Sequence, residues 1–168
     1  KHITLTQILT YLKQKDKPIF YLDTHAGAGE YSLVDGYAVT NSEHRWGIDR
    51  LLNLPGACPA PVTIYLDEIR RYQTAAQRLQ RYPGSPCLAA SLLRTEDRLE
   101  LYERHPTDFP LLRDRFCYDR RVRVLESDGF HAIQATLPPL ERRGLILIDP
   151  SYETEDDYSR VVEAITAG

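Results

Sequence analysis

The tetrapeptide Asp149-Pro150-Ser151-Tyr152 carries the residue types that a planar amine needs in order to attack an electrophile. Acceptors must bind the hydrogens of such an amine, so that the nitrogen lone pair points at the electrophile. The Asp149 carboxylate and the Pro150 carbonyl can be these acceptors, and the Tyr152 ring can stack on a nucleobase. The alternative is a turn after a strand with a packed tyrosine. We treat Asp149, Pro150 and Tyr152 as candidate catalytic residues.

A glycine-containing loop follows the apolar run 19–22 and includes His25, Gly27 and Gly29. Because glycine lacks a Cβ atom, the backbone of such a loop can pass close to a nucleotide. The full dinucleotide-binding pattern needs a further glycine where this chain has Ser32, and no P-loop pattern occurs anywhere in the sequence. The loop is therefore compatible with a nucleotide-like ligand without identifying one.

Other polar residues lie at the ends of predicted strands. Glu103 can accept hydrogen bonds from both hydroxyls of a ribose, and Asp128-Gly129 can place a carboxylate on an adenine amino group. The alternatives are an exposed carboxylate and an ordinary Asp-Gly turn. His25 can donate to a ligand carboxylate or be a plain loop histidine. Ser85 can contact the ligand, but serines in such a position are more often turn or helix-cap residues.

Four short apolar runs alternate with segments of helical periodicity. The predicted strands cover 19–22, 99–103, 122–125 and 145–148, and the predicted helices cover 5–12, 88–93, 106–116, a short segment ending at 137, and 156–167. The region 31–81 has helical spacing and no strand signal, so we predict an inserted helical subdomain there, followed by a turn over 82–86.

This alternation predicts an α/β fold with a doubly wound, mostly parallel sheet. An acid lies at or just after each predicted strand end, namely Asp23, Glu103, Asp128 and Asp149. Ligands of such sheets bind beyond the carboxyl ends of the strands, so these acids are expected to share one edge.

Composition excludes several classes of protein. The chain has 168 residues, 42% of them hydrophobic and 27% charged, which supports one folded core and excludes a disordered chain. Its net charge of −3 does not indicate a polyanion-binding protein, so any nucleic-acid surface must be local. The arginine-rich stretch 113–123 contains interleaved aspartates, so a solvated charged face is favoured over the alternative, a nucleic-acid-binding patch.

The sequence lacks an apolar run of membrane-spanning length and a signal-peptide pattern, which predicts a soluble cytoplasmic protein. The three cysteines, Cys58, Cys87 and Cys117, form no metal-binding pattern, so we expect reduced thiols and no metal site. The chain starts at Lys1 and contains no methionine, which suggests a fragment.

Several literal strings together closely resemble one bacterial family, the 23S ribosomal RNA adenine-N6 methyltransferases known as RlmJ. The resemblance runs from Lys1 to Gly168 and keeps the order and approximate spacing of the family's motifs. These strings are Tyr-Leu-Asp-Thr-His-Ala-Gly-Ala-Gly at 21–29, Tyr-Pro-Gly-Ser-Pro at 82–86, Glu103 with His105-Pro106, Asp-Gly-Phe at 128–130, and Arg-Arg-Gly-Leu-Ile-Leu-Ile-Asp-Pro at 142–150.

The resemblance implies a Rossmann-like class I methyltransferase fold that uses S-adenosylmethionine, with a helical insertion after the first loop. It implies that Asp149 orients the amine, accepts its proton and lies close to the cofactor. The implied substrate is one adenine of 23S ribosomal RNA, protein-free or in an early assembly intermediate, and we expect a monomer. The implied cofactor-binding residues are Lys1, His2, His25, Gly27, Gly29, Ser85, Glu103, Asp128, Gly129 and Asp149.

The chain departs from the family pattern at three points. The family has a basic, histidine-containing segment ahead of the position of Lys1, and the class I sheet has more strands than the four predicted here. Both points favour a fragment, a partial domain over 1–168, whose fourth strand is prone to edge pairing. Ser151 replaces the second proline of the usual Asp-Pro-Pro-Tyr. A proline at that position would hold Pro150 in an extended conformation and fix its carbonyl, whereas serine does not, so we expect slower or unchanged methylation.

Three other functions remain open at this point. A DNA adenine-N6 methyltransferase would use the same tetrapeptide, and a non-catalytic nucleic-acid-binding protein linked to the use of external DNA would need no cofactor. A nicotinamide oxidoreductase would account for the glycine loop and Glu103 but leaves residues 149–152 without a role.

Overall fold

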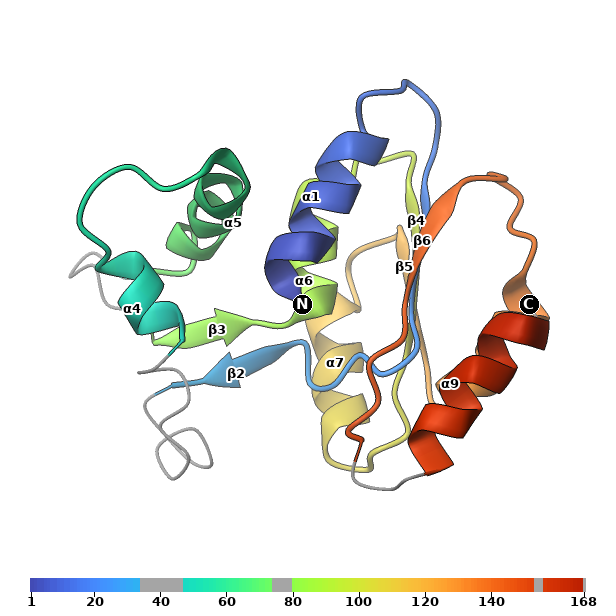
Figure 1. Ribbon diagram of the computed structural model, residues 1–168. Coiled ribbons are helices and arrows are strands. Elements are labelled where there is room, and N and C mark those ends of the chain that lie inside the picture. The colour runs from blue at the N-terminus through green and yellow to red at the C-terminus, as the bar shows by residue number, and fades with distance from the viewer. Residues whose placement is uncertain (34–46, 74–79, 153–155, 168) are drawn as a thin grey trace.

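The computed structural model describes residues 1–33, 47–73, 80–152 and 156–167, and shows a parallel sheet between two helical layers (Figure 1). This arrangement confirms the predicted α/β class with a mostly parallel, doubly wound sheet. The elements in chain order are α1 (His2–Leu12), β1 (Phe20–Asp23), β2 (Glu30–Ser32), α4 (Ile48–Leu52), α5 (Ala60–Arg70), β3 (Arg81–Pro83), α6 (Ser85–Leu92), β4 (Arg98–Tyr102), α7 (Asp108–Phe116), β5 (Val122–Leu125), α8 (Gly129–Thr136), β6 (Gly144–Leu147) and α9 (Asp156–Ala167).

The main sheet has four strands in the order β5-β4-β1-β6, and all of its pairings are parallel. All four residues of β1 are buried, as expected of a strand covered on both faces. From β1 the chain proceeds to β4 and β5 on one side and then returns to β6 on the other. The strand order thus reverses between β1 and β6, and ligands of such sheets bind beyond the carboxyl ends at this point.

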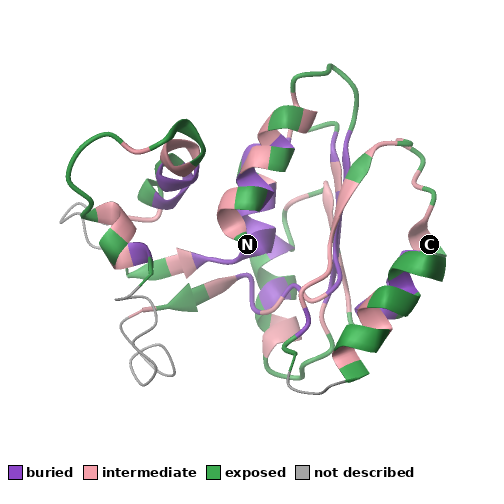
Figure 2. Cartoon of the chain, viewed as in Figure 1, coloured by how far each residue is buried: buried purple, intermediate pink, exposed green. Residues whose placement is uncertain are grey.

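Two hydrophobic clusters lie on opposite faces of the sheet. Tyr21 of β1 belongs to the cluster under α1, α6 and α7, which includes Leu9 and Leu88. Phe20 and Leu22 belong to the cluster under α8 and α9. Successive side chains of a strand point to opposite faces, so β1 contributes to both clusters. Figure 2 shows the buried residues along the strands and on the sheet-facing sides of the helices.

The inserted region differs from its prediction because it is bounded by strands. Strands β2 and β3 pair antiparallel, with Tyr31 opposite Tyr82, and the Leu33 N–H donates to the Gln80 carbonyl at 2.8 Å. The expectation of no strand over 31–81 and of a plain turn over 82–86 was therefore wrong. Each strand is three residues long and its partner is distant in sequence, so neither has a local periodic signal.

Helices α4 and α5 lie at the far end of this ribbon, where the predicted helical spacing is confirmed (Figure 1). The helical spacing predicted for 31–81 also included Trp46, Ala76 and Leu79, which lie outside the described residues. Helix α5 is linked to the rest of the chain by side chains: Gln7 donates to the Pro61 carbonyl at 3.3 Å, and the Ser91 hydroxyl donates to Glu68 at 2.9 Å.

Within the described parts of the chain, none of the helices combines the length and the apolar character needed to span a membrane. All three cysteines are free thiols: Cys87 is buried, Cys58 is half-buried and Cys117 is exposed.

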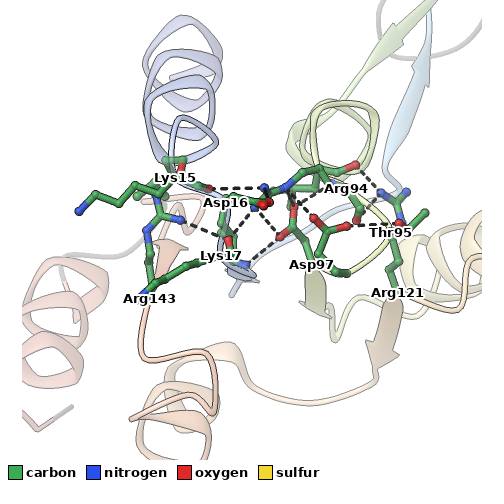
Figure 3. A network of polar contacts seen from close by, with 12 residues as sticks. Lys15, Asp16, Lys17, Arg94, Thr95, Asp97, Arg121 and Arg143 are labelled. Atoms are coloured by element: carbon green, nitrogen blue, oxygen red, sulfur yellow. Dashed lines mark hydrogen bonds and ion pairs between the residues drawn. The ribbon is translucent and has the colours of Figure 1, made fainter.

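A polar network ties the amino ends of β1 and β4 together at the edge opposite the candidate site (Figure 3). The buried Asp97 carboxylate accepts from the Ile19 N–H at 2.8 Å and from the Arg94 N–H at 2.7 Å. Arg121 donates to the Leu93 carbonyl at 2.6 Å and to Asp119 at 2.6 Å. Arg121 therefore caps the end of α6, and the expectation of a solvated charge does not hold for it.

We expect Asp97→Ala to lower the free energy of unfolding by about 2–4 kcal/mol, because it leaves the buried Ile19 N–H and the half-buried Arg94 N–H without an acceptor. Asp97→Asn retains one acceptor oxygen and should cost less. The control is Glu96→Ala, which removes a surface partner of Arg94 and should cost less than about 1 kcal/mol. Urea unfolding measures all three, and an Asp97→Ala midpoint equal to that of Glu96→Ala would refute the structural role of Asp97.

Candidate functional site

The site lies at the carboxyl ends of β1 and β6, where the strand order reverses. Thr24 fastens the loop after β1 to the end of β6, because its N–H and its hydroxyl donate to the Leu147 carbonyl at 3.0 and 3.1 Å. The segment that follows β6 contains Asp149, so the two most distinctive segments of the sequence meet at this edge.

Asp149 forms an ion pair with Lys1, whose ammonium lies 2.5 Å from Oδ2. Both side chains are about two-fifths exposed, with values of 41% for Lys1 and 38% for Asp149. No hydrogen bond to Oδ1 is present among the described residues. One carboxylate oxygen is thus fixed by a cation, and the other is left as an acceptor.

Pro150 is buried, whereas Tyr152 is 39% exposed with its ring centroid 4.8 Å from that of Tyr158 in α9. Tyr152 has a φ of +54°, in the left-handed region that costs a residue with a Cβ atom about 1–2 kcal/mol. Such conformations occur preferentially where a ligand or substrate requires them.

A buried carboxylate, that of Asp23, organises the end of β1. Its Oδ2 accepts from the Ser85 hydroxyl at 2.6 Å and from the Tyr21 hydroxyl at 2.9 Å, and its Oδ1 accepts from the His25 N–H at 3.3 Å. Burial raises the pKa of Asp23, although these hydrogen bonds oppose the rise. Ser85, a predicted cofactor residue, is itself buried and holds Asp23 in this structure.

The glycine loop is held by Glu103. The Gly27 N–H donates to Glu103 Oε2 at 2.7 Å, and the His105 N–H donates to Oε1 at 2.7 Å. Gly27 has a φ of +63°, and a Cβ atom there would lie 2.1 Å from the Tyr31 hydroxyl. Each Glu103 oxygen keeps one lone-pair direction, so the carboxylate can still accept hydrogen bonds from a ligand.

Asp128 caps the N-terminus of α8. Its Oδ1 accepts from the Phe130 N–H at 2.9 Å, and its Oδ2 accepts from Arg160 at 2.6 Å and Arg104 at 3.4 Å. Burial acts to raise the pKa of Asp128, but the Arg160 and backbone hydrogen bonds outweigh it and the pKa is lowered. Gly129 follows directly, and a Cβ atom there would lie 1.9 Å from the Thr24 carbonyl oxygen.

His25 lies between these two parts of the site. Its ring meets the Phe130 ring edge-on with centroids 4.8 Å apart, and its Nδ1 is 2.8 Å from the Thr24 hydroxyl. Burial lowers the pKa of His25, although the acids Asp128 and Glu103 oppose this. The ring is therefore a neutral group at neutral pH.

His2, at the start of α1, is adjacent to the Lys1–Asp149 pair. Its Nδ1 lies 2.7 Å from the Tyr82 hydroxyl, and its Nε2 is buried without a hydrogen-bond partner among the described residues. A buried polar atom of this kind marks a position where a ligand atom can bind.

The structure places the predicted site residues on the loops after β1, β4, β5 and β6 and at the start of α1 and α6. It brings Lys1 to Asp149 and Glu103 to Gly27, whereas Ser85 contacts the site through Asp23. Sequence reasoning did not assign roles to Asp23, Arg160, Tyr65 or Tyr82. Asp23 had a signal, because a carboxylate that ends a fully apolar strand is expected to be buried and therefore hydrogen-bonded.

These residues fit a nucleoside-type cofactor. The orphan Nε2 of His2 is a polar atom that a ligand could satisfy. Glu103 retains acceptor capacity for hydroxyl groups. Asp149, which pairs with Lys1 next to His2, presents one free acceptor oxygen that can orient an amine.

Comparisons with known proteins identify relatives of this chain. The sequence pattern of the family described as "Ribosomal RNA large subunit methyltransferase D, RlmJ" matches residues 16–168. The chain is 47% identical over 168 residues to the Ribosomal RNA large subunit methyltransferase J of Escherichia coli, and 46% identical to that of Haemophilus influenzae. All of this chain is covered in both cases, and it spans 59% of the length of each relative.

A crystal structure of a Legionella pneumophila protein has the same fold. It superposes with a TM-score of 0.87 at 42% sequence identity, over 99% of this chain and 60% of that one. Together with the mixed α/β architecture, these relatives confirm the predicted Rossmann-like fold.

Proposed function

We propose, since this chain belongs to the RlmJ family of ribosomal RNA large subunit methyltransferases, that it methylates N6 of an adenine in 23S ribosomal RNA with S-adenosylmethionine as methyl donor. The observation that carries this proposal is the position of Asp149. It lies at the reversal point of the sheet, with one oxygen held by Lys1 and the other available to a substrate amine.

We assign the cofactor to the edge formed by the glycine loop, α8 and the start of α1. Glu103 would accept hydrogen bonds from the ribose hydroxyls, and Asp128 with the Gly129 backbone would contact the adenine of the cofactor. His2, which is neutral, would contribute an N–H donor. The Thr24 hydroxyl donates to Leu147, so His25 donates its Nδ1–H to Thr24 and would offer the cofactor its Nε2 atom as an acceptor. Ser85 would act through Asp23, which keeps the end of β1 in place.

S-adenosylmethionine supplies a methyl group on a positively charged sulfur, which makes that carbon an electrophile. The target adenine has to leave its stack to reach the site, as bases do in other base-modifying enzymes. The Asp149 Oδ1 atom and the Pro150 carbonyl then accept the two hydrogens of its amine, and Tyr152 stacks on the ring. As the nitrogen–carbon bond formed, the carbon–sulfur bond would break and the sulfur would leave as the neutral thioether of S-adenosylhomocysteine. The extra proton on the nitrogen would pass to Asp149 and from there to solvent.

The substrate is expected to be 23S ribosomal RNA before the subunit is assembled, because an adenine must be accessible in order to be turned out of its stack. The protein would act on it as a cytoplasmic monomer. The net charge of −3 implies that any RNA contact is confined to a local surface.

The test is transfer of tritium-labelled methyl groups from S-adenosylmethionine by the full-length protein. Three acceptors are compared: protein-free 23S ribosomal RNA, assembled large subunits, and duplex DNA of matched length. Label recovered as N6-methyladenosine from the free RNA supports the proposal. Label on DNA would identify a DNA methyltransferase, and nucleic-acid binding without any label would identify a non-catalytic binding protein.

A further inference from the structure

The two ring nitrogens of His2 differ: Nε2 has no hydrogen-bond partner among the described residues, whereas Nδ1 contacts the Tyr82 hydroxyl. Burial and the positive charge of Lys1 lower the pKa of His2 to about 4, although Asp149 opposes this. The ring is therefore neutral at neutral pH, with a hydrogen on one nitrogen and a lone pair on the other. Which nitrogen carries the hydrogen decides whether Nε2 offers a ligand a donor or an acceptor.

Two tyrosines form a hydrogen-bonded chain that ends on Nδ1 of His2. The Tyr82 hydroxyl of β3 lies 2.7 Å from Nδ1, and the Tyr65 hydroxyl of α5 lies 2.8 Å from the Tyr82 hydroxyl. The His2 and Tyr82 rings are stacked, with centroids 5.6 Å apart and planes 28° apart. Burial raises the pKa of both tyrosines, so both keep their hydroxyl hydrogens. The two hydrogen bonds therefore connect α5 of the inserted region to His2 at the start of α1.

The direction of this chain can be assigned from its donors and acceptors. If Tyr65 donates to Tyr82, then Tyr82 donates to Nδ1 and the ring hydrogen is on Nε2. In the opposite direction Nδ1–H donates to Tyr82 and Tyr82 to Tyr65, and the Tyr65 hydrogen has no acceptor among the described residues. Without a ligand each direction leaves one donor unpaired, Nε2–H in the first and the Tyr65 hydroxyl in the second. A ligand acceptor at Nε2 removes this cost only in the first direction. A phenol is also a stronger acid than a neutral imidazole and hence the better donor, which favours the first direction.

We propose that Tyr82, supported by Tyr65, is a positioning residue that fixes His2 in the Nε2–H tautomer, so that His2 donates a hydrogen bond to a carboxylate or hydroxyl oxygen of the bound cofactor. This inference rests on the proposed function, because it places His2 in the cofactor site. Through Tyr65, the inserted helix α5 acts on cofactor affinity without itself touching the ligand.

The first experiment measures the tautomer in the full-length protein without ligand, from two-bond proton–nitrogen NMR correlations of the histidine rings. The His2 signals are identified by their loss in His2→Gln. We expect the Nε2–H pattern in the wild type, a mixture of tautomers in Tyr82→Phe, and a smaller change in Tyr65→Phe. Tyr11→Phe, which removes an exposed hydroxyl from α1, should leave the pattern unchanged. An Nδ1–H ring in the wild type would overturn the inference.

The second experiment measures the binding of S-adenosylhomocysteine by calorimetry. Tyr82→Phe should weaken binding by about five- to tenfold, and Tyr65→Phe by about twofold. In steady-state assays the same variants should raise KM for S-adenosylmethionine and leave kcat unchanged, because His2 is assigned no role in the chemical step.

A double-mutant cycle separates tautomer control from simple support of the fold. The side-chain amide of His2→Gln presents an N–H near the position of Nε2 whatever its neighbour does. In that background, Tyr82→Phe should therefore have no further effect on binding. If the two substitutions are additive, Tyr82 supports the local fold instead and the inference is wrong. Thermal unfolding of each variant confirms that it is folded.

The two proposals fail in different ways. If the wild type binds S-adenosylhomocysteine and Tyr82→Phe binds it equally well, the role of Tyr82 is overturned and the proposed function is unaffected. If the wild type does not bind it at all, the proposed function is overturned and the ligand role of His2 falls with it.

Discussion

Replacing Asp149 with alanine is expected to reduce methyl transfer to ribosomal RNA by about 10²- to 10⁴-fold, the range for loss of a group that orients and deprotonates a nucleophile. The substitution removes the Oδ1 acceptor that would hold the amine and leaves Lys1 without its partner at 2.5 Å. Because Glu103, Asp128 and the glycine loop are untouched, the affinity for S-adenosylhomocysteine should change only modestly. Single-turnover transfer of labelled methyl groups, together with calorimetry, measures both quantities.

Two further variants show which property of Asp149 matters. Asp149→Asn keeps the size and one carbonyl acceptor but accepts a proton poorly, so it should remain far below the wild type. Asp67→Asn removes an exposed carboxylate from α5, where it pairs only with Arg70 among the described residues, and should have full activity. Wild-type turnover by Asp149→Ala would eliminate both the assignment of Asp149 and the proposed reaction.

Gly129→Ala is expected to damage both the fold and the site. The added Cβ atom would lie 1.9 Å from the carbonyl oxygen of Thr24 and 2.5 Å from its carbonyl carbon. Because both atoms belong to the backbone, α8 or the loop after β1 must move by roughly 1 Å, at a cost at the upper end of about 1–3 kcal/mol. For a chain of this length the expected fall in Tm is roughly 6–12 °C.

The same movement displaces Asp128, which precedes Gly129, and His25, whose ring contacts Phe130. Methyl transfer should therefore fall by about 100-fold, since misplacement by about 1 Å is sufficient for such a loss. Gly56→Ala is the matched control: a Cβ atom there meets nothing within 4 Å, and only its φ of +92° opposes the substitution. It should cost about 1–2 kcal/mol of stability and leave transfer unchanged. Equal activities of the two variants would show that Gly129 is not part of the site.

The sheet could be predicted closely from the sequence. The run 122–125 coincides with β5, and the other three predicted strands agree with β1, β4 and β6 to within one residue. Each of these strands is a short apolar run bounded by polar residues, so the signal is local. The acids Asp23 and Asp149 were placed correctly for the same reason, because in a parallel sheet the residues after the strands share one edge.

The start of α6 was predicted three residues too late. It begins at Ser85, with Pro86 in its first turn, where the missing N–H of proline is not needed. The sequence therefore held a usable signal that we interpreted as a turn.

The remaining errors and omissions concern contacts between distant residues. The Lys1–Asp149 pair spans 148 positions, and the bond between Tyr65 and Tyr82 joins a helix to a strand that was not predicted. No local pattern encodes such contacts, because they depend on how α1 and α5 pack once the sheet has formed. The family resemblance placed Lys1 and His2 near the cofactor, and the structure adds their partners.

The antiparallel pairing of β2 and β3 has an evolutionary consequence. It holds the two ends of the inserted region side by side, with Ser32 opposite Arg81. The positions at which the inserted region joins the rest of the fold therefore do not depend on the length of the segment between β2 and β3. Doubling the length of a flexible loop costs only about 0.6 kcal/mol. The inserted region can therefore change in length among relatives at a small cost in stability, provided that Tyr65 of α5 keeps its hydrogen bond to Tyr82.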